Sequence, residues 1–222
     1  MQHEFWHERW DTNQIGFHLQ EVNPVLLKHW SRMNAAAGQR VLVPLCGKTL
    51  DIIWLLQQGF QVTGVELSER ALDELCDTIE QHLGIAMEKF QDGDRVRYQG
   101  TGIELIAGDF FALQRHHLPA IDVVYDRAAL VALPEEMRAA YCKQLIELTA
   151  AAPQLLVSFS YDQSHMSGPP FAVLAEEVAQ HYQDVYQLEC VDQRDIIEHE
   201  DKFRQRGLTS FIQDVYCLIP RS

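Results

Sequence analysis

Short apolar runs alternate with stretches of helical periodicity through the middle of the chain. RVLVPL at 40–45 precedes TLDIIWLLQQG, in which apolar side chains recur at helical spacing until Gly59. QVTGVEL at 61–67 precedes a second helical stretch, for which Ser68 is a suitable N-cap. Five apolar positions share one side of that second helix: Leu72, Leu75, Cys76, Ile79 and Leu83. Strands that alternate with helices in this way are typical of a parallel sheet covered by helices.

The alternation is interrupted near residue 100 and then continues. Asp-Gly at 92–93 and Gly-Thr-Gly at 100–102 are turn signals around RVRY and IELIA, and they predict a hairpin-like insertion that leads into the third strand. Pro134 opens another helical stretch. Further strands are predicted for four apolar runs: 121–126, 154–162, 185–192 and 211–220. The pattern therefore predicts an α/β fold with a doubly wound, mostly parallel sheet.

Residues 1–35 lack this alternation and are rich in aromatic side chains. Two helices are predicted there, and they carry five aromatic residues: Phe5, Trp6, Trp10, Phe17 and Trp30. At 222 residues the chain is long enough for one domain with a substantial core. We therefore expect a single domain over 1–222, with a helical N-terminal segment at 1–35 and an α/β core at 36–222.

Composition narrows the classes of partner. The formal net charge is −14 at pH 7, from 32 acidic and 18 basic residues, and such a surface repels the phosphates of nucleic acids. The five cysteines lie far apart without a CxxC pair, which argues against a disulfide framework or a zinc ribbon. The segment at 1–11 is polar and acidic, and no apolar run approaches the length of a membrane span. We expect a cytoplasmic protein that binds neither nucleic acid nor membrane.

The loop after the first predicted strand contains Gly47-Lys48-Thr49, which is how a phosphate-binding P-loop ends. A P-loop also needs a glycine five positions before Gly47, where this chain has Leu42, so the phosphotransferase interpretation fails. Glu66 ends the second strand nineteen residues after Gly47, where a carboxylate can accept hydrogen bonds from ribose hydroxyls. A dinucleotide would need more glycines around its diphosphate. S-adenosylmethionine carries adenosine without phosphate, and its positive sulfonium suits an acidic protein. A plain strand–turn–helix with a solvated Glu66 is the alternative.

A family resemblance extends over nearly the whole chain. The chain resembles the thiopurine S-methyltransferase family in FWHERWDTNQIGFH, VLVPLCGKTLDIIWL, VTGVELSERAL, AGDFFAL and YDRAALVALP, and also in SGPPFAV and GLTSF near its end. The combination of PLCGK, GVELS and DRAAL is specific, and the start of the chain close to its first Trp is similar to bacterial members. The resemblance implies a seven-stranded class I methyltransferase fold that uses S-adenosylmethionine, releases S-adenosylhomocysteine and needs no metal. It also implies that the N-terminal segment is a lid.

The resemblance implies roles for individual residues. The cofactor contacts that it implies are Trp10, Leu45, Gly47, Glu66, Asp109, Phe110 and Arg127. Trp10 would lie in the segment that closes over the cofactor, and Glu66 would hold the ribose. Leu45 and Gly47 would approach the methionine half. Asp109 and Phe110 of GDFF would flank the adenine, by hydrogen bonding and by ring packing.

The implied substrate site is a wall for a flat aromatic thiol. Its residues would be Phe17, Pro169, Pro170 and Phe171. Arg127 would lie by the cofactor and the substrate sulfur, where its fixed charge could stabilise a thiolate. The alternative for Arg127 is a salt bridge to the neighbouring Asp126.

The function implied is methyl transfer from S-adenosylmethionine to small aromatic or heterocyclic thiols by a monomer. Relatives of this kind are also associated with selenium and tellurium compounds, so detoxification and tellurite resistance are a plausible setting. Two alternatives remain at this point: a halide or hydrosulfide methyltransferase, and a non-catalytic protein of the same fold that binds a small molecule.

Four other signals carry less weight. HEFWH at 3–7 matches the spacing of a zinc-protease helix, but it has no upstream strand for a substrate and its aromatic pair suits packing. His-His at 116–117 suits a solvated turn, and Cys46 has no histidine near it in sequence, so we expect a small, partly buried thiol. The basic cluster KFRQRG at 202–207 either reaches the mouth of the active site or solvates a loop, and the second is the more common case.

Overall fold

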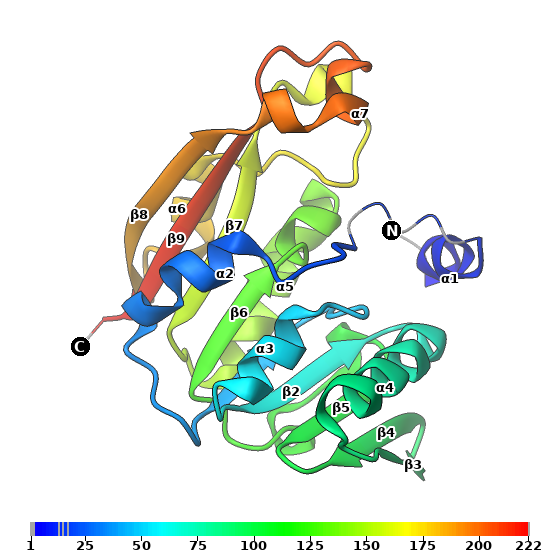
Figure 1. The fold of residues 1–222 in the computed structure, drawn as a ribbon. Coiled ribbons are helices and arrows are strands. Elements are labelled where there is room, and N and C mark those ends of the chain that lie inside the picture. Colours follow the sequence, from blue (N-terminus) through cyan, green and yellow to red (C-terminus); the bar gives the residue numbers. More distant parts are fainter. Residues whose placement is uncertain (1–2, 13, 15, 17, 222) are drawn as a thin grey trace.

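A computed structural model describes residues 3–12, 14, 16 and 18–221 (Figure 1). Within these residues nine strands form one sheet, in the order β3-β4-β5-β2-β1-β6-β7-β9-β8. The strands are β1 (Arg40–Val43), β2 (Gln61–Glu66), β3 (Glu88–Asp92), β4 (Arg95–Gly100), β5 (Ile103–Ala107), β6 (Val123–Arg127), β7 (Gln154–Ser160), β8 (Tyr186–Asp195) and β9 (Ile212–Pro220). The chain order reverses on either side of β1, which is the mark of a doubly wound sheet.

The prediction of a mostly parallel, doubly wound sheet is confirmed. The five central strands, β5-β2-β1-β6-β7, are parallel to one another. The strands β4 and β9 are antiparallel to their neighbours, so β3 and β8 beyond them again run with the central five. The expected count of seven strands is wrong, because the β3–β4 hairpin adds an antiparallel edge. All five residues of β3 are exposed, so no alternation of buried and exposed positions marks this strand in the sequence.

Most helices begin and end close to the capping and helix-breaking residues in the sequence. They are α1 (His3–Asp11), α2 (Pro24–His29), α3 (Asp51–Gln57), α4 (Glu69–Leu83), α5 (Glu135–Thr149), α6 (Ala175–Tyr182) and α7 (Asp201–Arg204). The Ser68 side chain accepts a hydrogen bond from the Ala71 N–H, as expected of an N-cap, and Gly84 ends α4 in the left-handed conformation at φ 66°. Pro134 directly precedes α5, as predicted.

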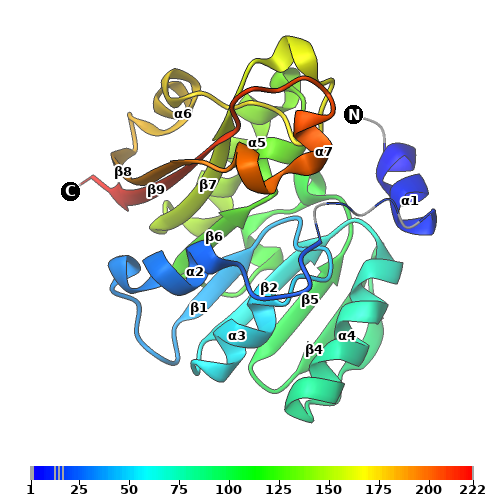
Figure 2. The same cartoon turned by 45° about the horizontal axis from the view of Figure 1, so that its top comes forward.

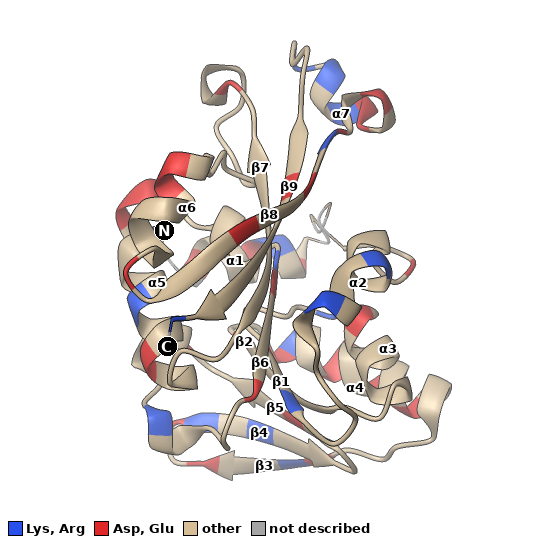
Figure 3. Ribbon diagram, turned by 90° about the vertical axis from the view of Figure 1, so that its left-hand side faces the viewer, with Lys and Arg blue, Asp and Glu red and all other residues tan. Residues whose placement is uncertain are grey.

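Helices cover both faces of the sheet (Figure 3). On one face α2, α3 and α4 pack against the strands, and the α4 stripe of Leu72, Leu75 and Ile79 is completely buried there. On the other face lie α5 and α6, with Tyr141 and Tyr182 in the core. None of the helices in the described part of the chain has both the length and the apolar character needed to cross a bilayer.

The N-terminal segment is divided between the core and the carboxyl end of the sheet. Leu26 and Trp30 are core residues, and the Trp30 ring contacts those of Phe60 and Tyr125 edge to face. In contrast α1 stands apart from the sheet, near the beginning of α4 (Figure 2). Its tie to α4 is exposed, with Arg70 Nη1 3.8 Å from the Asp11 carboxylate. The part of the segment that lines the cavity described below therefore precedes residue 20.

Candidate active site

A cavity of about 300 Å³ lies beyond the carboxyl ends of the central strands. This is the edge at which doubly wound sheets bind ligands, next to the point where the strand order reverses. Eight of the predicted site residues lie on its wall: Trp10, Leu45, Glu66, Asp109, Phe110, Arg127, Pro169 and Pro170. The fold thus brings together residues that are up to 160 positions apart in the sequence.

Glu66 is buried at the end of β2, with 6% of its surface exposed. Its Oε2 accepts a hydrogen bond from the Gly47 N–H at 2.9 Å, and its Oε1 accepts one from the Ser68 N–H at 3.0 Å. Burial raises the pKa of the Glu66 carboxyl, and the backbone N–H groups of Ser68, Gly47 and Leu67 partly oppose this rise. An ionised carboxylate has about four lone-pair positions, so roughly two remain for donors from the cavity.

The loops after β1 and β6 have left-handed backbone conformations at the cavity wall. Leu45 has φ 45° and Ala128 has φ 62°, and both residues line the cavity. Such angles are rare for residues other than glycine and are typical of functional sites. Gly47, at φ 53°, does not line the cavity but supplies the N–H that holds Glu66.

Cys46 is buried in the same loop and packs on β2. A Cβ added at Gly64 would lie 2.9 Å from the Cys46 Sγ and 2.6 Å from the Leu105 side chain, so this position in β2 needs glycine. Burial, and next the charge of Glu66, raises the pKa of the Cys46 thiol well above its usual value. Cys46 is therefore a packed thiol and not an activated nucleophile.

The segment after β5 forms a short turn on the cavity wall. Asp109 caps the 3-10 turn Phe110–Ala112 by accepting a hydrogen bond from the Phe111 N–H at 2.9 Å. The Phe110 ring is 2% exposed and packs on Tyr141, so most of it belongs to the core. The partly buried Phe111, which the sequence pattern did not single out, also lines the cavity.

Arg127 ends β6 and does not pair with its neighbour Asp126. Asp126 accepts hydrogen bonds from the Leu130 N–H at 3.1 Å and the Tyr141 hydroxyl at 2.8 Å. Successive side chains of a strand point to opposite faces, which separates the two residues. Among the described residues no ion pair or hydrogen bond engages the Arg127 guanidinium, which lines the cavity. The alternative of a salt bridge between these neighbours is therefore wrong.

The N-terminal residues form one side of the cavity. Trp10 is 3% exposed, and Trp6, Arg9 and His18 lie beside it on the wall. Burial, and then the positive charges of Lys48 and Arg127, lowers the pKa of His18. The negative charges of Glu74 and Asp51 partly oppose this shift.

Only part of the predicted substrate wall lies at the cavity. Pro169 and Pro170 line the cavity, and the Tyr161 hydroxyl donates a hydrogen bond to the Pro170 carbonyl at 2.6 Å. Phe171 is not on the cavity wall: its N–H bonds to the Val131 carbonyl, and its ring packs beneath the Arg138 guanidinium. Phe17, the other residue of the predicted wall, lies outside the described residues.

The basic cluster at 202–207 contributes to the site. Lys202, Phe203 and Arg206 line the cavity together with Phe159 and Phe211. The Phe203 and Phe211 rings lie 4.5 Å apart, and Phe159 stacks on Phe211 at 4.7 Å. This segment reaches the cavity because β8 and β9 carry it past the end of β7, which periodicity alone does not reveal.

The zinc interpretation of the N-terminal helix gains no support. Within the described part of the chain no group of three or more His, Cys, Asp or Glu side chains is arranged to hold a metal ion. The His116 and His117 rings pack on each other at 4.1 Å on the side of the sheet near β4.

Solved structures similar to this fold are methyltransferases. One is the 1,6-didemethyltoxoflavin-N1-methyltransferase of Burkholderia thailandensis, solved with 1,6-didemethyltoxoflavin and S-adenosylhomocysteine; it matches with a TM-score of 0.63 and 15% identity, over 98% of this chain and 87% of that one. A TehB-like methyltransferase from Corynebacterium glutamicum matches with a TM-score of 0.54 and 14% identity, over 99% and 98%. The fold is that of the S-adenosylmethionine-dependent methyltransferases.

Sequence comparison specifies the family. The sequence model of the thiopurine S-methyltransferase family matches residues 1–221. A thiopurine S-methyltransferase of Pseudomonas aeruginosa (strain UCBPP-PA14) is 48% identical over 219 residues, covering 98% of this chain and 99% of that protein. Another, from Pseudomonas fluorescens (strain SBW25), is 46% identical over 222 residues, covering 100% of both. The chain belongs to the thiopurine S-methyltransferase family and is an S-adenosylmethionine-dependent methyltransferase.

Proposed function

We propose that the chain methylates the sulfur of small aromatic or heterocyclic thiols in this cavity. The observation that carries the proposal is the buried Glu66 carboxylate at the end of β2, held by two N–H groups and open to a cavity that Arg127 also lines. Glu66 is a hydrogen-bond acceptor, and Arg127 is a cation that pairs with no described residue. Such a site suits two ligands, one that donates hydroxyl groups and one that is anionic.

The residues present fit S-adenosylmethionine. Glu66 retains acceptor positions for ribose hydroxyls, and Asp109 lies on the same wall after β5. The left-handed backbone conformation of Leu45 turns the loop after β1 along the cavity, where the methionine half would lie. When bound, this cofactor supplies a methyl group that its sulfonium has already activated. The protein therefore needs no strong base and acts by alignment, which can supply ~7–11 kcal/mol of a barrier.

Arg127 would act on the acceptor. An aromatic thiol reacts as its thiolate, and a nearby guanidinium favours that form. No described residue neutralises Arg127, so its charge is available to an incoming anion. Aromatic and proline side chains also line the cavity: Phe159, Phe203, Phe211, Pro169 and Pro170. Such a wall suits a flat ring that carries the reacting sulfur.

A methyl-transfer assay tests the proposal. Purified protein, S-adenosylmethionine and thiophenol would be incubated, and mass spectrometry would follow methyl phenyl sulfide and S-adenosylhomocysteine. Glu66→Gln keeps the size of the side chain but replaces one acceptor with a donor that faces backbone N–H groups, so product should fall sharply. Glu147→Gln, an exposed position of α5 on the far side of the sheet, is the matched control and should leave the rate unchanged.

This assay, together with calorimetric binding of S-adenosylhomocysteine, separates the alternatives. Binding of S-adenosylhomocysteine without a thiol product would contradict the acceptor and direct the search to halide, hydrosulfide, selenium and tellurium acceptors. Binding without product from any acceptor would indicate a binding protein of this fold. Absence of both binding and product would contradict the proposed cofactor site.

A further inference from the structure

Two arginines of the edge hairpin face the segment that follows β5. Arg95 and Arg97 are alternate residues of β4, so their side chains lie on the same face of the sheet. Although β3 is exposed throughout, these side chains are only 13% and 12% exposed. Their burial comes from the two 3-10 turns Phe110–Ala112 and Arg115–His117, which pack over them.

Arg95 holds the first of these turns. Its Nη2 donates a hydrogen bond to the Ala112 carbonyl at 3.2 Å, and its Nη1 lies 3.5 Å from Asp94. The aliphatic stem lies against Gly108, where an added Cβ would be 3.4 Å from Cγ and 3.7 Å from Cδ. Arg95 thus contacts both ends of the segment 108–112, which contains the cavity residues Asp109, Phe110 and Phe111.

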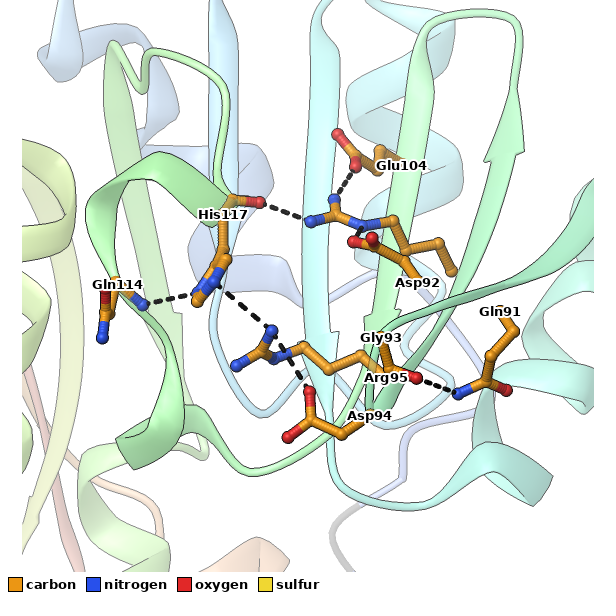
Figure 4. Close-up of polar contacts among 9 residues, drawn as sticks. Gln91, Asp92, Gly93, Asp94, Arg95, Glu104, Gln114 and His117 are labelled. Atoms are coloured by element: carbon orange, nitrogen blue, oxygen red, sulfur yellow. Dashed lines mark hydrogen bonds and ion pairs between the residues drawn. The ribbon is translucent and has the colours of Figure 1, made fainter.

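Arg97 and His117 add further contacts around Arg95 and the second of these turns. Arg97 Nη2 donates to the His117 carbonyl at 2.9 Å, and its other nitrogens pair with Asp92 and Glu104. The Gln114 N–H donates to His117 Nδ1 at 2.9 Å, and His117 Nε2 lies 3.4 Å from Arg95 Nη1. The same Nη1 lies 3.5 Å from Asp94, so His117 and Asp94 both contact the Arg95 guanidinium (Figure 4).

We propose that Arg95 is a positioning residue for the cofactor site: it fixes the segment 108–112 and so holds Asp109 and Phe111 on the cavity wall. The inference rests on the proposed function, in which this segment holds the adenine end of the cofactor. It gives the β3–β4 hairpin a role in the activity, although no residue of the hairpin lines the cavity. Loss of Arg95 should weaken cofactor binding and leave the acceptor site unchanged.

Arg95→Met tests the hydrogen bonds separately from the packing. Methionine keeps an aliphatic stem against Gly108 but removes the guanidinium. A hydrogen bond from a charged donor is worth enough that the Kd of S-adenosylhomocysteine, measured by calorimetry, should rise roughly tenfold. The KM for S-adenosylmethionine should rise with it, while kcat and the KM for the thiol stay within about twofold. Lys89→Met is the matched control, because Lys89 lies on the same hairpin but pairs with Asp73 and Glu69 of α4.

A second variant, Arg95→Ala, tests the contact of the stem with Gly108. A Cβ added at Gly108 would lie 3.4 Å from Arg95 Cγ and 3.7 Å from Cδ, which is ordinary contact, so the stem packs on this segment. Arg95→Ala removes both the stem and the guanidinium, and it should weaken S-adenosylhomocysteine binding at least as much as Arg95→Met. An unchanged Kd in the folded Arg95→Ala variant would overturn the inference.

The remaining outcomes also decide between the two proposals. An unchanged Kd in Arg95→Met, or an equal rise in the KM for cofactor and thiol, would show that Arg95 has no specific positioning role. If the unaltered protein does not bind S-adenosylhomocysteine, the proposed function fails instead, and the Arg95 variants are not needed to show it.

Discussion

Glu66 ends β2 and Arg127 ends β6, the two strands that flank β1, and the fold provides hydrogen-bond partners for the two side chains differently. Two backbone N–H groups hold the Glu66 carboxylate in one orientation, so its remaining lone pairs have a fixed direction. Arg127 has no such partner among the described residues, and its guanidinium is available to whatever enters the cavity. A fixed acceptor beside an available cation is what a site needs if it orients one ligand and receives the charge of another.

The charge and the shape of Arg127 can be tested separately. Arg127→Ala should lower kcat/KM for an aromatic thiol by roughly 10²-fold, the scale of a lost donor to a developing charge. Arg127→Lys keeps the charge but loses the planar fork, so its activity should lie between those of the alanine variant and the unaltered enzyme. Steady-state kinetics would measure both, with Arg194→Ala, an exposed arginine of β8, as the control. An unchanged kcat/KM in Arg127→Ala would exclude the proposed role.

Unlike Arg127, Asp126 is buried and hydrogen-bonded within the protein, so it should affect stability rather than catalysis. It is fully buried, and burial raises its pKa to about 6, with the Tyr141 hydroxyl and backbone N–H groups opposing the rise. The folded protein therefore binds the proton more tightly than the unfolded chain, whose aspartate pKa is about 3.9. The contribution of Asp126 to stability is fully present below about pH 4 and is lost as pH rises through about 6, a change of about 3 kcal/mol.

Asp126→Asn should remove this dependence. Urea unfolding at several pH values would compare the two proteins, and the stability of the unaltered protein relative to the variant should fall between about pH 4 and 6. A difference between the two proteins that stays constant over this range would show that Asp126 does not titrate in it.

At the scale of elements, the buried strands and amphipathic helices could be predicted from the sequence, and exposed or distant elements could not. The stripe of Leu72, Leu75 and Ile79 fixes the buried face of α4, and Gly59 and Ser68 mark helix ends, because these signals are local. Strand β3 has no buried face, so its sequence carries no periodic signal. Glu66 could be found from its spacing after Gly47. For Phe203 and Arg206 the sequence left two alternatives and favoured a solvated loop, because only the path of β8 and β9 brings them to the cavity.

The helix α1 stands apart from the sheet (Figure 2). Trp10 is buried against the cavity, and two polar contacts of this segment with the rest of the chain are exposed: Arg70 with Asp11, and Lys202 Nζ with the Gly16 carbonyl at 3.2 Å. Elements with few buried contacts open readily in solution. A ligand that fills the cavity should add a surface for Trp10 and close such openings.

Amide exchange should therefore slow in α1 when S-adenosylhomocysteine binds. Mass spectrometry would compare peptides over residues 4–12 with and without ligand, and peptides from α5 would show whether the effect is local. Slower exchange in α1 with little change in α5 is the expected result. Equal protection of α1 in both states would mean that this helix does not respond to the ligand.

Across the whole molecule, negative charge dominates the surface, but the cavity has a different balance of charge. The net charge is −14, yet five basic side chains line the cavity beside four acidic ones: Arg9, Lys48, Arg127, Lys202 and Arg206 beside Asp51, Glu66, Asp109 and Glu200. Charges farther apart than about 8–10 Å are largely screened in physiological salt, so an entering molecule responds to these side chains more than to the distant surface. An anionic acceptor is therefore compatible with an acidic protein.

Ligand binding at a site built from so many elements should stabilise the entire domain. The cavity draws residues from α1, from the loops after five strands and from the segment around α7, so unfolding of the domain destroys the site. A ligand that binds only the folded state at about 100 times its Kd adds roughly 2.7 kcal/mol. For a domain of this size, about 1 kcal/mol raises Tm by roughly 2–4 °C. S-adenosylhomocysteine should thus raise Tm by roughly 5–11 °C in calorimetry, in a single transition. Glu66→Gln should lose most of this shift and Glu147→Gln should retain it. A full shift in Glu66→Gln would place the ligand elsewhere in the molecule.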